Sequence, residues 1–89
     1  MDEDKIVNYF ELLVMEQIQH TLTKTGKISS KDQALDIACV ALNQLPPRYV
    51  RHRVDATFYR TDDELRDMQR QVEQSVRKGY EVVMANPRH

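Results

Sequence analysis

The sequence predicts a small, mainly α-helical single domain with its elements in the order helix, helix, strand, helix. Apolar residues recur at steps of three and four over three long stretches, which is typical of amphipathic helices. One stretch of about ten residues alternates apolar and polar side chains instead, which indicates a half-buried strand. With 89 residues the chain is expected to form one domain, residues 1–89, with a thin core.

The first predicted helix runs from Asp4 to about Lys24, and Gly26 is a natural stop beyond it. Asn8 and Glu11 lie one turn apart at the side of its apolar stripe. Two interpretations are open for this pair: an exposed shoulder of the helix, or a polar contact to a neighbouring helix or to a ligand. The stripe itself consists of Ile6, Phe10, Leu13, Val14, Ile18 and Leu22.

A second helix is predicted from Lys31 to Leu45, because Ser30 and Gln33 match a capping box at its start. It is apolar nearly all round, so we expect it to be the central and most buried helix. Leu35 and Leu42 of this helix, together with Phe10 of the first, are the expected core residues.

Three residues of the second helix need separate interpretation. Cys39 is the only cysteine, which excludes an internal disulfide, and we expect it to act as a small apolar residue. Asp36 and Asn43 lie on one face. Either they mark the solvent side, with Asn43 helping to end the helix, or they are buried and hydrogen-bonded and so fix the chain that leaves it.

Pro46 and Pro47 stop the second helix, because proline cannot donate a backbone hydrogen bond and disfavours helix in the residue before it. The predicted strand follows, from about Val50 to Tyr59. Its apolar face includes His52, and its other face carries arginines between Tyr49 and Tyr59.

The last predicted helix covers about 22 residues and begins at a capping box formed by Thr61 and Glu64. Gly79 is expected to weaken its last turns. Arg66 and Arg70 have acidic neighbours, so we interpret them as part of a solvated face.

Charge is unevenly distributed in a chain of net charge −1. The segment from residue 48 to residue 60 holds Arg48, Arg51, Arg53 and Arg60 against Asp55. A compact basic segment in a nearly neutral chain favours a small anionic ligand over a long polyanion, although an acidic patch on a partner fits equally well. The helices lack a basic recognition face, so direct DNA binding is not expected.

Several classes of protein are not favoured by the sequence. No nucleophile–base or acid–base pair occurs at usable spacing, so we expect no enzyme. The three scattered histidines do not make a zinc site, and no cofactor is expected. No run approaches the roughly 18 apolar residues of a membrane span, and the acidic start is unlike a signal peptide. We therefore expect a cytoplasmic protein without membrane contact.

From Val7 to Val50 the chain resembles the late competence development protein family, ComFB. The resemblance rests on residues in and after the second helix: Asp36-Ile37, Ala41-Leu42-Asn43, Leu45, Pro46-Pro47 and Arg48-Tyr49-Val50. A weaker match lies in Val7-Asn8, Glu11 and Val14. Nothing beyond Val50 is matched.

The resemblance implies a dimer, and members of the family bind one of two kinds of ligand. Some members bind zinc through cysteines just before the central helix, but this chain has ISSKDQ from Ile28 to Gln33, so zinc is not implied. Other members are cytoplasmic receptors for cyclic dinucleotides. No ligand-binding position of that branch is matched here residue by residue.

The leading hypothesis is therefore a dimeric regulatory module that binds a cyclic dinucleotide of the c-di-GMP type and signals to an unknown downstream protein. The alternative is a protein-interaction module in competence or motility regulation without a small ligand. The candidate ligand-binding residues are Arg48, Tyr49, Arg51, Arg53, Asn8 and Glu11, and the structural motif is Asp36, Asn43, Pro46 and Pro47.

The predicted strand also leads to the expectation of a homodimer. No other segment of the chain alternates, so the strand finds no partner within the chain, and its backbone groups are left unpaired. Two copies related by a two-fold axis solve this, because each strand then pairs antiparallel with its mate. Arginines from both copies would share one face.

Overall fold

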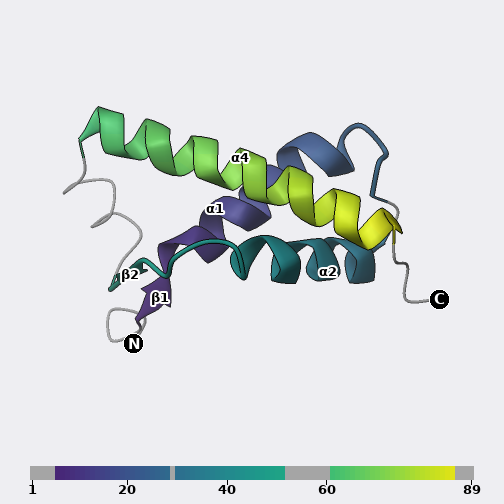
Figure 1. Ribbon diagram of the computed structural model, residues 1–89, viewed down its shortest axis with the longest axis horizontal. Coiled ribbons are helices and arrows are strands. Elements are labelled where there is room, and N and C mark those ends of the chain that lie inside the picture. Colours follow the sequence, from purple (N-terminus) through teal and green to yellow (C-terminus); the bar gives the residue numbers. More distant parts are fainter. Residues whose placement is uncertain (1–5, 29, 52–60, 86–89) are drawn as a thin grey trace.

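The computed structural model describes residues 6–28, 30–51 and 61–85, and these residues are mainly helical, as predicted (Figure 1). A two-residue strand opens the described part of the chain, and a second one pairs with it. In chain order the elements are β1 (Val7–Asn8), α1 (Tyr9–Gln17), the π-helical segment η2 (Ile18–Thr23), α2 (Lys31–Leu42), β2 (Tyr49–Val50) and α4 (Asp62–Ala85).

The core lies where α1, α2 and α4 meet, because each of these helices packs against the other two (Figure 1). Phe10 is 1% exposed, which confirms its prediction as a core residue. Val14, Ile37 and Val72 bring one fully buried side chain from each helix to the same cluster. The pairing of α2 with α4 is the most extensive of these contacts.

Burial on α2 is confined to one face, although the helix is apolar nearly all round and was expected to be the central and most buried one. Ile37, Ala38 and Ala41 are buried, whereas Cys39 is exposed. Leu35 is 44% exposed, so its prediction as a core residue is wrong, and Leu42 is only partly buried. The physical reason is that a helix that is apolar nearly all round gives little pattern from which to choose the face that meets its neighbours.

Gly79 allows α2 and α4 to approach closely. A Cβ placed on Gly79 would lie 2.8 Å from the carbonyl oxygen of Ile37, which is closer than real Cβ contacts come. Gly79 is buried, and α4 continues through it to Ala85. The expectation that Gly79 mainly weakens the last turns therefore missed its role in helix packing.

The start of the first helix differs from the prediction. Ile6, which was placed in the apolar stripe, is 71% exposed, and α1 begins only at Tyr9. Residues 7 and 8 form β1 instead, because their backbone pairs with β2. The helical segment does end before Gly26, as expected. Gly26 has a φ of 78°, and the Lys27 backbone N–H donates to the carbonyl oxygen of Leu22 at 3.0 Å.

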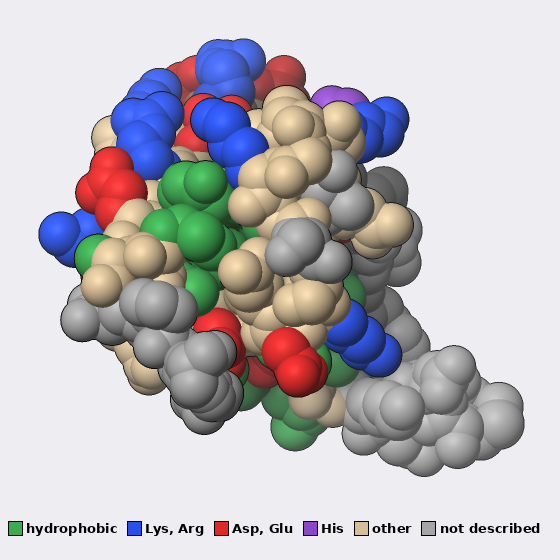
Figure 2. Space-filling model, turned by 90° about the vertical axis from the view of Figure 1, so that its right-hand side faces the viewer, with side chains coloured by type: hydrophobic (Ala, Val, Ile, Leu, Met, Phe, Trp, Pro, Cys, Tyr) green, Lys and Arg blue, Asp and Glu red, His purple; other side chains and the backbone are tan. Residues whose placement is uncertain are grey.

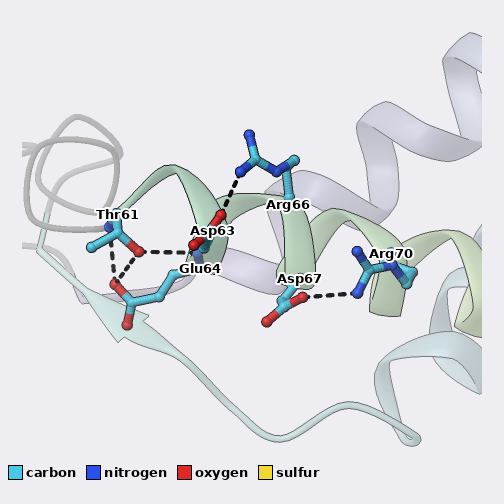
Figure 3. Close-up of polar contacts among 6 residues, drawn as sticks. All are labelled: Thr61, Asp63, Glu64, Arg66, Asp67 and Arg70. Carbon is cyan, nitrogen blue, oxygen red and sulfur yellow. Dashed lines mark hydrogen bonds and ion pairs between the residues drawn. The ribbon is translucent and has the colours of Figure 1, made fainter.

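Side-chain capping follows the sequence signals closely. The Ser30 hydroxyl accepts from the Gln33 backbone N–H at 3.1 Å at the start of α2. Before α4 the contact is reciprocal: the Thr61 N–H donates to a Glu64 carboxylate oxygen at 2.9 Å, and the Glu64 N–H donates to the Thr61 hydroxyl at 3.1 Å (Figure 3). Two of the four amides left open at a helix start are satisfied in this way.

The first turns of α4 carry exposed ion pairs, which agrees with the interpretation of a solvated face. Arg66 pairs with Asp63, and Arg70 pairs with Asp67 at 2.8 Å (Figure 3). All four side chains are more than half exposed, so each pair adds little to stability.

The strand prediction is only partly covered by the described residues. Residues 52–60, which include His52 and Arg53, lie outside them. β2 pairs antiparallel with β1, with Val50 opposite Val7 and Tyr49 opposite Asn8. The expectation that this strand has no partner within the chain is therefore wrong for Val50. Two residues are too short to show an alternating pattern, so β1 could not be detected in the sequence.

Across residues 6–28, 30–51 and 61–85, no helix combines the length and the apolar character needed to cross a membrane.

Candidate functional site

Asn8 joins the start of α1 to the segment that follows the double proline. Its side-chain Oδ1 accepts the Phe10 backbone N–H at 3.2 Å, which caps α1. The same oxygen accepts the backbone N–H of Arg48 at 2.9 Å, across 40 positions of sequence. Asn8 thus makes a polar contact, as in the second of the two interpretations, but its partner is the backbone of Arg48 and not the neighbouring helix that was expected.

A second bond holds the same crossing. The Tyr9 backbone N–H donates to the carbonyl oxygen of Arg48 at 2.6 Å. Both backbone groups of Arg48 are therefore bound by the start of α1, and the next two residues pair with β1. The backbone from Arg48 to Val50 is therefore held by these two hydrogen bonds and by pairing with β1. We call this arrangement the Asn8–Arg48 clamp.

The end of α2 delivers the chain to this clamp. Asn43 follows the last helical residue, and its side-chain Nδ2 donates to the Cys39 carbonyl oxygen at 3.0 Å. The interpretation in which Asn43 helps to end the helix is thus the one observed, whereas Asp36 is half-buried. Pro46 and Pro47 are exposed and lead directly into Arg48.

The clamp presents aromatic and basic side chains on a rigid backbone. Tyr49 is 65% exposed although its backbone is paired, so its ring is offered to solvent rather than to the core. Arg48 is half-buried and Arg51 is exposed. Because paired residues of an antiparallel ladder point to the same face, Tyr49 lies on the face of Asn8, and Val50 lies on the opposite face with Val7.

The predicted ligand-binding residues are thus brought together in part. Asn8, Arg48 and Tyr49 lie at one place, and Arg51 lies two positions further along. Glu11 is exposed in the first turn of α1. Arg53 lies outside the described residues. Ile6 is exposed just before β1, and no signal in the sequence separates it from the helical stripe.

The described residues contain no group of three or more His, Cys, Asp or Glu side chains arranged to hold a metal ion. The candidate site consists of arginines, a tyrosine ring and a fixed backbone. Such a surface can bind a ligand, because guanidinium groups donate paired hydrogen bonds and an exposed ring accepts a stacked planar group.

These features define a small, mainly helical module with a fixed Arg-Tyr surface at one end. The family model of the late competence development protein ComFB matches residues 7–87, and the chain belongs to this family. The match extends well beyond Val50, so α4 is part of the family's fold and not an addition to it. Membership suggests a competence-related regulatory protein. No curated protein and no solved structure matches the chain.

Proposed function

We propose that this protein is a dimeric cytoplasmic regulator that binds a cyclic dinucleotide of the c-di-GMP type and passes the signal to a downstream protein. The ligand is held by Arg48, Tyr49, Arg51 and Arg53. The observation that carries this proposal is the Asn8–Arg48 clamp, which fixes the backbone beneath Tyr49 while the ring is 65% exposed.

The chemistry of such a ligand fits this surface. A cyclic dinucleotide offers two phosphates and two purine bases. Arginine pairs in a bidentate way with phosphate or with the O6 and N7 atoms of guanine, and tyrosine stacks on the base plane. A backbone that is already fixed lowers the entropy lost on binding, because less of the site has to be ordered.

Two copies of the chain suit a ligand with two-fold symmetry. A two-fold axis places the same surface of each chain opposite its mate, so one ligand contacts equivalent arginines and tyrosines from both chains. Val50 pairs with Val7 of the same chain, so this two-fold arrangement does not rest on Val50 pairing with its own mate.

A second candidate function is a protein-interaction module with no small ligand. Exposed apolar side chains favour it: Ile6 and Tyr49 lie beside the clamp, and Met15 and Leu35, at 39% and 44% exposure, lie on α1 and α2. Exposed aromatic and aliphatic residues of this kind are typical contact points for partner proteins.

A thermal-shift panel separates the two functions. The protein is heated with c-di-GMP, with c-di-AMP and with linear dinucleotide controls at equal ionic strength. A receptor gains roughly 2.7 kcal/mol at a ligand concentration 100 times its Kd, so the cyclic ligand raises Tm clearly above the linear control. An unchanged Tm with every cyclic dinucleotide, up to millimolar concentration, contradicts the receptor and leaves the interaction module.

A further inference from the structure

A small hollow lies between η2, the Gly26 turn and α4, away from the Asn8–Arg48 clamp. Its volume is about 220 Å³. From α4 it is lined by Glu73, Arg77 and Tyr80, which follow one another at steps of four and three and therefore share one face of that helix. Lys27 closes it from the turn, and Thr21 closes it from η2.

Both cations of this hollow are placed by local structure. Lys27 follows Gly26, whose φ of 78° makes the turn, and its own N–H is bonded back to Leu22. Arg77 is carried by the middle of a 24-residue helix. The two residues are 50 positions apart in the sequence, so no local charge pattern indicates that they line the same hollow.

The wall formed by η2 is also fixed by hydrogen bonds. The side-chain Nε2 of Gln17 donates to the Thr21 hydroxyl at 3.0 Å, and its Oε1 accepts from Gln69 of α4 at 3.1 Å. Thr21 therefore accepts one bond and keeps its own hydroxyl hydrogen to donate. The π-helical turn that carries Thr21 is a local departure from α geometry of the kind that is frequent at functional sites.

The charges of the hollow favour an anion. Within residues 6–28, 30–51 and 61–85, neither Lys27 nor Arg77 is in an ion pair, although Glu73 lines the same hollow. The two cations outnumber Glu73 among the residues that line the hollow. At the end of the molecule where α4 finishes, Lys and Arg side chains, with Asp and Glu side chains among them, border an apolar area (Figure 2). Tyr80, Leu22 and Val76 supply the apolar lining of the hollow.

We propose that this hollow binds a compact phosphomonoester, with the phosphate between Lys27 and Arg77 and the organic part against the ring of Tyr80. Lys27 and Arg77 attract a phosphate against the single negative charge of Glu73, and Arg77 and Thr21 supply directed donors. The volume is below the roughly 300–1,000 Å³ of sites for drug-sized ligands, which favours a compact ligand, and none of the lining residues belongs to the Asn8–Arg48 clamp. The site is therefore separate from the one under Proposed function and does not depend on it.

The test is a titration of ¹⁵N-labelled protein followed by NMR, with phenyl phosphate and inorganic phosphate as probes at constant ionic strength. Phenyl phosphate is expected to give saturable shifts centred on the amides of Thr21, Lys27 and Arg77, with a Kd at least tenfold below that of inorganic phosphate. Shifts of equal size over all basic segments, or none, overturn the proposal.

Matched variants place the site. Lys27→Met and Arg77→Met are each expected to weaken phenyl phosphate binding at least tenfold. Lys78→Met removes the same charge from an exposed neighbour that does not line the hollow, and it is expected to change Kd less than twofold. All three side chains are exposed, so unchanged Tm values verify the fold. Equal effects of Lys27→Met and Lys78→Met overturn the proposal, because only general charge would then act.

Discussion

The side-chain oxygen of Asn8 accepts the backbone N–H of Arg48, 40 residues later in the chain, at 2.9 Å. The same oxygen caps α1 through Phe10. One short side chain thus sets both where the first helix begins and where the chain lies after the double proline. This contact therefore also helps to position Arg48 and Tyr49.

Removing the Asn8 oxygen is expected to destabilise the fold. Asn8→Ala loses an N-cap, which costs about 1 kcal/mol, and leaves the part-buried N–H of Arg48 without its acceptor, which adds about 1–3 kcal/mol. Urea denaturation measures the loss. Asn8→Asp keeps an acceptor oxygen and is the matched control, with a clearly smaller loss. A free energy of unfolding for Asn8→Ala within about 0.5 kcal/mol of wild type would show that the clamp does not stabilise the fold.

Gly79→Ala is expected to destabilise the protein although alanine is the better helix former. In an open helix this change gains about 0.5–1 kcal/mol. Here the new Cβ would lie 2.8 Å from the Ile37 carbonyl oxygen, so α2 and α4 must separate, at a cost of about 1–3 kcal/mol. Lys78→Ala, at the exposed neighbouring position, serves as the control and should change Tm little. A higher Tm for Gly79→Ala contradicts the close approach.

A buried and an exposed apolar side chain, Phe10 and Leu35, are expected to respond differently to truncation. Phe10→Ala removes a fully buried ring and should cost about 3–5 kcal/mol, enough to leave so small a domain largely unfolded. Leu35→Ala removes a side chain that is 44% exposed, so we expect a loss below about 1 kcal/mol. Thermal denaturation followed by circular dichroism compares them. A loss for Leu35→Ala as large as that for Phe10→Ala would mean that another surface covers Leu35, as in a dimer.

The elements that the sequence predicted well are those with a local chemical signature. Ser30 and Thr61 cap the helices that they were expected to cap, and Gly26 takes the left-handed conformation that ends the first helical stretch. These signals lie within three or four residues of the structure they determine, so no knowledge of the rest of the fold is needed.

What the sequence did not predict depends on partners distant in the chain. β1 exists because residues 7 and 8 meet Tyr49 and Val50, and the exposed face of Leu35 follows from where α1 and α4 lie. The close approach at Gly79 is equally a property of two helices. For the candidate site, the motif around Arg48 and Tyr49 was visible in the sequence, but its attachment to Asn8 was not.

Two arginines of the proposed site give a charge-matched comparison with the solvated face of α4. Arg48→Ala and Arg51→Ala are each expected to weaken cyclic dinucleotide binding at least tenfold without loss of the fold, because only the side chain of Arg48 leaves while its clamped backbone stays. Arg66→Ala removes the same charge from an exposed ion pair and should change Kd less than twofold. Fluorescence anisotropy with a labelled dinucleotide measures all three. Equal effects of Arg48→Ala and Arg66→Ala on Kd would mean that Arg48 contributes only through net charge.

The central claim is that the exposed ring of Tyr49, on its fixed backbone, is part of a receptor for a cyclic dinucleotide. Isothermal titration calorimetry of the protein with c-di-GMP tests it most directly, with light scattering on the same sample. We expect a dimer near twice the 10.5 kDa of one chain, saturable binding of one ligand per two chains, and a Kd at least tenfold higher for Tyr49→Ala. Absence of binding heat at several temperatures, or equal affinity for Tyr49→Ala and wild type, would contradict it.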